Sequence, residues 1–313
     1  MAPLTRDNFF RHVPQTWNDW HEAARALHVS RTSINTVDDL ESGSHTTQAQ
    51  YLVYRVLRPE TLPYQMINLQ ALNIQAEHGQ AVQWLGQFAP FRAYIQSIAA
   101  GANTTTFTPG AQDPYDLGLF EHPRREQQLA LGQILPVTVD EDTVNTGLLS
   151  FLASTLMKYP ANAAEWLIHR IALRANFTKA GYEARVDGYL ASATKETKIV
   201  LEAKRAPRSR IEPKVSMQET SEVLALLQQE TVLMPAANRP VLVSQDEQYI
   251  YLSLATYNQR YIDYLKGANG AMSLVAKDHF MKVQLYGPWS VASAGDMENF
   301  ARLILAIALK YGQ

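Results

Sequence analysis

Two neighbouring stretches decide the fold: residues 184–190 read Ala-Arg-Val-Asp-Gly-Tyr-Leu, and residues 198–205 read Lys-Ile-Val-Leu-Glu-Ala-Lys-Arg. Each contains a run of apolar residues, and a short polar segment separates the two. Such runs, bounded by turn residues, are typical of β-strands. The sequence therefore predicts two strands, over residues 182–190 and 197–205, that pair as a hairpin.

Strand periodicity places the charged residues of these stretches. Because side chains alternate between the two faces of a strand, Glu202 and Lys204 lie on one face, and Ala203 lies on the packed opposite face. A hairpin also brings Asp187 beside Glu202. Two adjacent carboxylates repel each other and are costly to remove from water, and a divalent cation relieves both costs. Carboxylate oxygens suit Mg²⁺, which activates a bound water and stabilises charge on a phosphate, while Lys204 can hold the attacking water or the phosphate.

Helices and further strands surround the predicted hairpin. Helical patterns cover residues 144–158 and 163–177 before it, and a capping box at Ser216 and Glu219 starts a helix that runs to about residue 230. A second hairpin (240–254), a helix (256–265), a strand (280–285) and a final helix (295–311) follow. This alternation predicts a mixed α/β fold in which a mixed sheet is flanked by helices.

The pieces Val186-Asp187 and Glu202-Ala203-Lys204 resemble the motif of the PD-(D/E)XK nuclease superfamily, which has the restriction-endonuclease-like fold. The resemblance covers about residues 145–290. It implies that Asp187, Glu202 and the Ala203 carbonyl are ligands of Mg²⁺ or Mn²⁺, and that Lys204 is the catalytic lysine. The proline that commonly precedes the aspartate in this family is missing here.

Two further residues receive roles from the resemblance. Glu165 matches an acidic residue on the first core helix, although it could equally pair with His169 four residues later. Gln218 matches a glutamine that some branches place beside the metal. Residues 257–264 and the segment Tyr286-Gly-Pro-Trp289 are similar to uncharacterised fungal proteins for which this fold has been predicted.

The charge distribution suggests two domains. Residues 1–140 hold nine Arg, no Lys and thirteen acids, whereas residues 141–313 hold nineteen basic and seventeen acidic residues. Helical periodicity dominates the first hundred residues, beginning with Trp17 and Trp20 on one helical face. We therefore predict an α-helical N-terminal domain over residues 1–140 and the nuclease-like α/β domain over residues 141–313. The acidic balance of the first favours a protein partner there.

Several functional classes are excluded by what the sequence lacks. It has no cysteine, so disulfides, thiolate nucleophiles and cysteine zinc sites are impossible. It contains no His-x-x-x-His, Gly-x-Ser-x-Gly, P-loop or dinucleotide-binding pattern. The apolar run Leu303–Leu309 is far shorter than a membrane helix, and the first twenty residues lack an apolar signal core. These features favour an intracellular protein with no membrane contact.

Basic residues gather after the second strand. Seven Lys or Arg against three Glu lie between residues 195 and 214. We expect the last four of these cations to grip backbone phosphate beside the site: Arg205, Arg208, Arg210 and Lys214. The alternative for this stretch is a solvated charged loop.

The expected function is metal-dependent hydrolysis of phosphodiester bonds in nucleic acid, with DNA favoured over RNA. The alternative is a catalytically inactive protein of the same fold that binds nucleic acid or another protein. A cation held between Asp187 and Glu202 supports the enzyme, whereas Lys204 lying across both carboxylates supports the binding protein.

Overall fold

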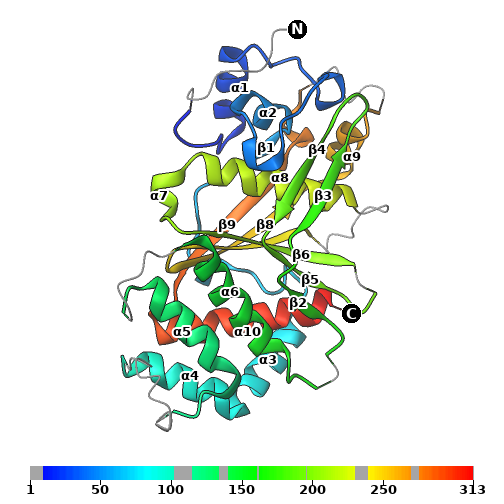
Figure 1. Cartoon of the computed structure of the whole chain (residues 1–313). Coiled ribbons are helices and arrows are strands. Elements are labelled where there is room, and N and C mark those ends of the chain that lie inside the picture. Colours follow the sequence, from blue (N-terminus) through cyan, green and yellow to red (C-terminus); the bar gives the residue numbers. More distant parts are fainter. Residues whose placement is uncertain are drawn as a thin grey trace.

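The computed structural model describes residues 10–101, 115–133, 140–160, 162–194, 196–229, 239–268 and 275–312. Its centre is a seven-stranded mixed sheet with the strand order β1-β9-β8-β7-β6-β5-β2 (Figure 1). The pairs β1–β9 and β6–β7 are parallel, and the other neighbours are antiparallel. The strands are β1 (Val56–Leu57), β2 (Glu165–Leu167), β5 (Gly188–Ala191), β6 (Thr197–Lys204), β7 (Val241–Asp246), β8 (Tyr249–Thr256) and β9 (Met281–Ser290).

Helices cover both faces of the sheet (Figure 1). Below it in that view lie α3 (Gln75–Gln87), α4 (Ala89–Ala99), α5 (Glu121–Ala130), α6 (Glu141–Leu156) and α10 (Ala294–Tyr311). Above it lie α1 (Trp17–Ala26), α2 (Gln48–Val53), α7 (Arg208–Ile211), α8 (Lys214–Gln229) and α9 (Gln259–Leu265). The predicted mixed α/β class is therefore confirmed.

A separate two-stranded ribbon, formed by β3 (Ile171–Asn176) and β4 (Gly181–Val186), packs beside α8. The sequence-based prediction of a helix over residues 163–177 is wrong, because this segment contains β2 and β3. Its burial follows a period of two: Leu173 and Ala175 are buried, and Arg174 and Asn176 are exposed. That alternation is typical of a half-buried strand and not of a helix.

The predicted hairpin is present in part: the first predicted strand is divided into β4, which pairs with β3, and β5, which pairs with β6. β5 pairs with β6 in antiparallel fashion, with Gly188 opposite Leu201. The predicted alternation along β6 is also confirmed, because Ile199 and Leu201 pack with the lower helices and Val200 packs with the upper ones. The second predicted hairpin corresponds to β7 and β8, and the last predicted helix corresponds to α10.

The hydrophobic core is not divided at residue 140. The upper cluster joins Leu52 of α2 to Leu224 of α8, and the lower cluster joins Leu85 of α3 to Leu148 of α6. The strand β1, which also precedes residue 140, forms one edge of the main sheet. Residues on both sides of the predicted domain boundary therefore build the same two layers.

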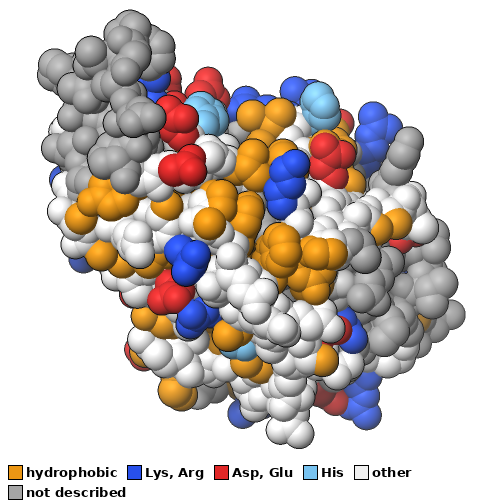
Figure 2. Space-filling model, turned by 90° about the horizontal axis from the view of Figure 1, so that it is seen from below, with side chains coloured by type: hydrophobic (Ala, Val, Ile, Leu, Met, Phe, Trp, Pro, Cys, Tyr) orange, Lys and Arg blue, Asp and Glu red, His pale blue; other side chains and the backbone are white. Residues whose placement is uncertain are grey.

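The surface below the lower helices mixes side chains of both charges with hydrophobic ones (Figure 2). Met157, just after α6, is 59% exposed. Within the described part of the chain, every helix is too short or too polar to span a bilayer.

Candidate metal centre

Asp187 occupies the single residue between β4 and β5, where the chain leaves the ribbon and enters the main sheet. Its backbone N–H donates to the Leu201 carbonyl over 3.0 Å, and its Oδ2 accepts the Ala203 N–H over 3.0 Å. The following residue is Gly188, where a Cβ would lie 2.9 Å from the Leu167 carbonyl oxygen. The close approach of β2 thus requires glycine and fixes the position of the neighbouring aspartate.

β6 carries Glu202 and Lys204 on its upper face, toward α8. Glu202 is 1% exposed, and its Oε1 accepts hydrogen bonds from the Lys204 ammonium and the Gln218 side-chain amide, the latter over 2.6 Å. Between them, Ala203 packs its methyl group against Ala130 and Val144 on the opposite face. Strand alternation therefore separates the charged face from the packed one.

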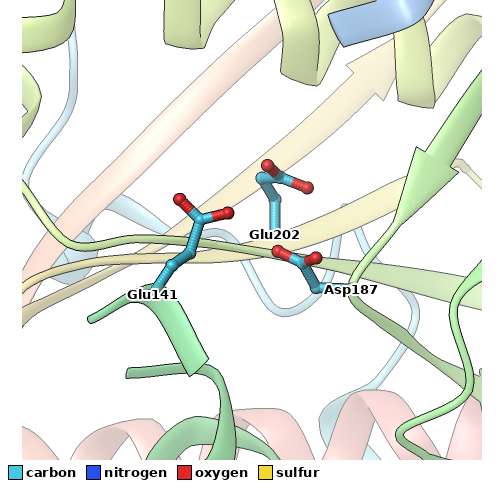
Figure 3. A group of neighbouring side chains, drawn as sticks. All are labelled: Glu141, Asp187 and Glu202. Atoms are coloured by element: carbon cyan, nitrogen blue, oxygen red, sulfur yellow. The ribbon is translucent and has the colours of Figure 1, made fainter. Parts of the chain in front are cut away.

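Glu141 completes a group of three carboxylates, called the acidic cluster below: Glu141, Asp187 and Glu202. Glu141 is the first residue of α6, whose N-cap Asp140 accepts the Thr143 N–H over 2.7 Å. One carboxylate oxygen of each of the three residues lies within 4.8 Å of the others. Figure 3 shows the three side chains, from α6, the start of β5 and β6, converging on one space.

The acidic cluster lines an open pocket of about 520 Å³. Lys204 and Gln218 line the same pocket, together with Arg170 and Arg185 of the ribbon region. The site predicted from the sequence is therefore brought together in part: Asp187, Glu202, Lys204 and Gln218 share one cavity.

Burial and mutual repulsion control the protonation of this site. Burial, reinforced by the Asp187 charge, raises the pKa of Glu202 to about 8, although Lys204 opposes the shift. Glu222 on α8 is fully buried beside it, and burial together with Glu202 raises its pKa well above the ordinary value. Gln218 links the two carboxyl groups, since its amide also donates to Glu222 Oε1 over 3.0 Å. Burial opposes charge on Lys204, but Glu202 and Glu141 outweigh it and raise the lysine pKa.

The donor set fits a hard divalent cation. Glu202 Oε2 is buried, and no N–H group of a described residue donates to it; the Glu222 carboxyl group lies within hydrogen-bonding reach of Glu202. A buried carboxylate oxygen without an N–H donor is costly, particularly beside two other carboxylates. Oxygen ligands of this kind bind Mg²⁺ or Mn²⁺. The residues that would hold the cation are those of the acidic cluster.

One predicted site residue, Glu165, lies elsewhere. Glu165 is exposed on the edge strand β2 and does not line the pocket. The predicted helix that would have carried it does not exist, and Glu141 at the start of α6 supplies the helical carboxylate instead. The sequence signal for Glu141 was weak, because acidic residues are favoured in the first turn of any helix.

The predicted phosphate-binding stretch is also divided. Arg208 is buried in an ion-pair network, called the arginine network below: Arg58, Arg208, Glu219 and Asp246. Its Nε lies 2.7 Å from Asp246 Oδ2, and it also contacts Glu219 Oε1, so it is not available to bind phosphate. The other three predicted cations are exposed, but none lines the pocket: Arg205, Arg210 and Lys214. Glu219, expected as a capping residue, belongs to the network because α8 already begins at Lys214.

Ion pairs connect the acidic cluster to nearby cations. Lys204 Nζ contacts Glu202 and lies 3.5 Å from Glu141 Oε1, and Arg170 Nη2 lies 3.2 Å from Asp187 Oδ1. The lysine therefore spans Glu141 and Glu202, not Asp187 and Glu202. Asp187 takes its cation from the ribbon region, which the sequence did not predict.

Comparison of the chain with protein-family models, with curated proteins and with solved structures finds no match in any of the three. The chemistry of the site must therefore be argued from its own residues.

Proposed function

We propose that the chain is a metal-dependent nuclease with a restriction-endonuclease-like fold of the PD-(D/E)XK type, acting on phosphodiester bonds of nucleic acid, with DNA favoured over RNA. The observation that carries the proposal is the group of three carboxylates, from Glu202, Asp187 and Glu141, that converges inside an open pocket. Lys204 lies on the same strand face two residues away.

The order of elements also supports the proposal. α6 precedes the strands, β5 and β6 form the antiparallel pair that carries Asp187 and Glu202, and α8 leads from β6 to the parallel strand β7. This arrangement agrees with the resemblance in the motif, with Glu141 in the role expected for Glu165. Gln218 lies on α8, as expected for the glutamine beside the metal.

In the proposed reaction, the residues of the pocket would have separate roles. Bound at the acidic cluster, a divalent cation would lower the pKa of a water molecule and stabilise charge on a phosphate. The Ala203 N–H holds the Asp187 carboxylate in place, and Gln218 orients Glu202. The Lys204 ammonium, charged because of its acidic neighbours, is positioned to hold the attacking water or a phosphate oxygen.

A second candidate is the non-catalytic binding protein, which the ion pairs favour. Lys204 and Arg170 already neutralise much of the charge of the acidic cluster without a cation. In that case the residues would maintain the fold and the pocket, and no metal would be needed.

Cleavage and melting experiments separate the two candidates. We expect wild type to cleave single- or double-stranded DNA or RNA oligonucleotides with Mg²⁺ or Mn²⁺ but not with EDTA. Lys204→Ala should lower the rate about 10²–10³-fold and keep the Mn²⁺-dependent rise in melting temperature. Asp187→Asn should lose most of that rise. The matched control is Lys179→Ala, because Lys179 pairs with Asp38 outside the pocket.

The outcome that overturns the nuclease proposal is a wild-type chain with neither a metal-dependent melting shift nor cleavage. A melting shift without cleavage would favour a metal-binding protein without catalytic activity. Cleavage by Lys204→Ala at the wild-type rate would show that the active residues lie elsewhere.

A further inference from the structure

The outer face of the β3–β4 ribbon carries arginines toward the pocket. On β4, Arg185 is exposed and lies opposite Ala172 of β3 in the ribbon register. Arg170 immediately precedes β3 and is also exposed. Both arginines and Ala172 line the pocket with the acidic cluster. The ribbon therefore forms a cationic wall facing three carboxylates.

The formal charges of the pocket lining balance. Its acidic side chains are the three of the acidic cluster, and its basic side chains are Arg170, Arg185 and Lys204. A phosphate diester gains little from a neutral pocket. A divalent cation at the acidic cluster would add two positive charges and make the pocket attract an anion.

Arg170 is held by the same carboxylate that a cation would need. Its Nη2 lies 3.2 Å from Asp187 Oδ1 and 3.7 Å from Asp142 Oδ1. A cation bound to Asp187 would weaken the first of these contacts, because it takes the charge of the carboxylate. The contact to Asp142 is exposed, and exposed ion pairs contribute about 0–1 kcal/mol. The guanidinium group would thus become available to another anion.

Arg185 is also available to bind an anion, because its ion-pair partner among the described residues, Glu183, is shared with another arginine. Its Nε donates to Glu183 Oε1 over 3.0 Å, and the arginine side chain of this pair is 76% exposed. Glu183 is shared with Arg174, which lies 3.7 Å from its other oxygen. One carboxylate therefore serves two arginines. A guanidinium fork binds phosphate oxygens in a bidentate manner, which an exposed, shared carboxylate cannot match.

We propose that Arg170 and Arg185 form the phosphate-binding wall of this pocket, and that they take the backbone phosphate of a nucleic acid strand once a divalent cation has drawn Asp187 away from Arg170. This inference rests on the proposed function, since it requires the cation and the nucleic acid. It moves the phosphate contact from the stretch after β6, where Arg208 is buried, to the ribbon.

Equilibrium binding tests this inference without turnover. The probe is a fluorescein-labelled oligonucleotide, single-stranded or duplex, titrated with the full chain in Ca²⁺ or in EDTA, and a gel checks that the probe stays intact. Ca²⁺ is used because it also takes carboxylate oxygens. We expect tighter binding in Ca²⁺ than in EDTA. In Ca²⁺, Arg170→Gln and Arg185→Gln should each weaken binding about tenfold and lower the salt slope by about one.

The controls lie close to these residues. Arg174→Gln changes the same face of the ribbon but lies outside the pocket lining, and Arg210→Gln changes the stretch predicted from the sequence. Both should bind within about twofold of wild type. Because all four arginines are exposed, we expect the melting curves of all four variants to match that of wild type.

The other outcomes separate a failure of this inference from a failure of the proposed function. Equal losses in Arg174→Gln and Arg170→Gln would indicate a general charge effect, and equal binding in Ca²⁺ and EDTA would remove the role of the cation. Cleavage by wild type with unchanged binding of Arg170→Gln and Arg185→Gln would leave the nuclease proposal intact and reject the wall. Binding that depends on Ca²⁺ and on both arginines, without cleavage by wild type, would support the phosphate-binding wall and reject the nuclease proposal.

Discussion

The acidic cluster and the arginine network lie beside the same helix, α8, and yet differ in charge balance. Both lie between the sheet and α8: Gln218 and Glu222 reach one, and Glu219 reaches the other. In the sheet, Glu202 is opposite Ser244 and Lys204 is opposite Asp246, so the two sites occupy neighbouring strands. The acidic cluster opens into a pocket and is called the open site below. The arginine network is buried and is called the closed site.

The closed site pairs Glu219 with two arginines, although burial still raises the pKa of its second carboxyl group, Asp246, to about 7. Glu219 is contacted by Arg58, whose Nη2 lies 2.6 Å from its Oε2, and by Arg208. Burial alone would raise the pKa of Glu219, but the two arginines outweigh burial and lower it to about 2. At the open site, burial wins and the Glu202 pKa rises. A charged residue that is fully paired supports the fold, whereas at the open site the neighbouring cations do not outweigh the burial of Glu202.

The largest expected effect comes from breaking the closed site. Glu219→Gln leaves Arg208 and Arg58 buried without their shared counter-charge, which should lower the free energy of unfolding by about 3–5 kcal/mol. The matched control is Glu222→Gln on the same helix, where burial and the neighbouring Glu202 raise the carboxyl pKa and so disfavour its charged form, and this change should cost much less. Urea unfolding measures both. An equal loss of unfolding free energy in both variants would contradict the proposed difference between the two sites.

A packing change should disturb the open site and leave the closed one intact. A Cβ at Gly188 would lie 2.9 Å from the Leu167 carbonyl oxygen and 3.0 Å from Leu201 Cδ1. We expect Gly188→Ala to cost about 1–3 kcal/mol through overpacking and to shift Asp187. The Mn²⁺-dependent melting shift should shrink. Gly86→Ala, where a Cβ meets nothing within 4 Å, is the control. A full metal response in Gly188→Ala would argue against a role for the tight β2–β5 contact.

The third test concerns the carboxylate that the sequence did not reveal. Glu141→Gln removes one charge of the acidic cluster at the start of α6. We expect Mn²⁺ affinity to fall at least 10–100-fold, the loss that even outer-shell partners produce, with little change in stability without metal. Calorimetric titration measures the affinity, and Glu165→Gln is the control because Glu165 lies outside the pocket. If Glu165→Gln lowered the Mn²⁺ affinity more than Glu141→Gln did, Glu165 and not Glu141 would be the ligand.

The smallest effect is a pH dependence of opposite sign at the two sites. The pKa of Glu202 is raised from 4.5 to about 8, so the folded state holds its proton more tightly, and stability in EDTA should fall as pH rises through this range. The slope is at most about 1.4 kcal/mol per pH unit for one group. Glu222 and Asp246 shift in the same direction, so Glu202→Gln should reduce the slope and the double variant with Glu222→Gln should reduce it further.

The closed site should respond at the acid end. Because the Glu219 pKa is lowered to about 2, its contribution is present above 4.5 and is lost as pH falls toward 2. Unfolding curves recorded across both ranges check the two signs. A stability that rises between pH 5 and 8 in EDTA would contradict the assignment for Glu202.

Sequence reasoning identified the residues that share one strand pair. Asp187, Glu202 and Lys204 follow from local alternation, which depends on the backbone alone. Gln218 followed from the resemblance, and its helix was visible as a capped apolar segment. The mixed α/β class followed from the alternation of strand and helix patterns, because that pattern needs no knowledge of which elements touch.

The residues that were missed or misplaced depend on contacts between distant segments. Glu141 and Glu202 are 61 positions apart in the sequence. Arg208 was predicted to bind phosphate. The sequence could not show that it is buried in ion pairs, because its partners Glu219 and Asp246 are supplied by α8 and β7. Glu165 was placed on a helix because the two-residue period in residues 171–176 was overlooked. The predicted boundary at residue 140 followed charge composition, whereas packing in both layers joins the two parts.

The parallel pairing of β1 with β9 has a consequence for how the chain is made. Val56 lies opposite Met281, so the first strand to leave a ribosome must wait for more than two hundred further residues before its neighbour exists. Contacts of such separation slow folding and leave intermediates exposed. During synthesis, the apolar face of the early segments would therefore be open to chaperones. Ribosome-bound chains truncated before β9 should be protease-sensitive around β1, and chains that include α10 should be protected.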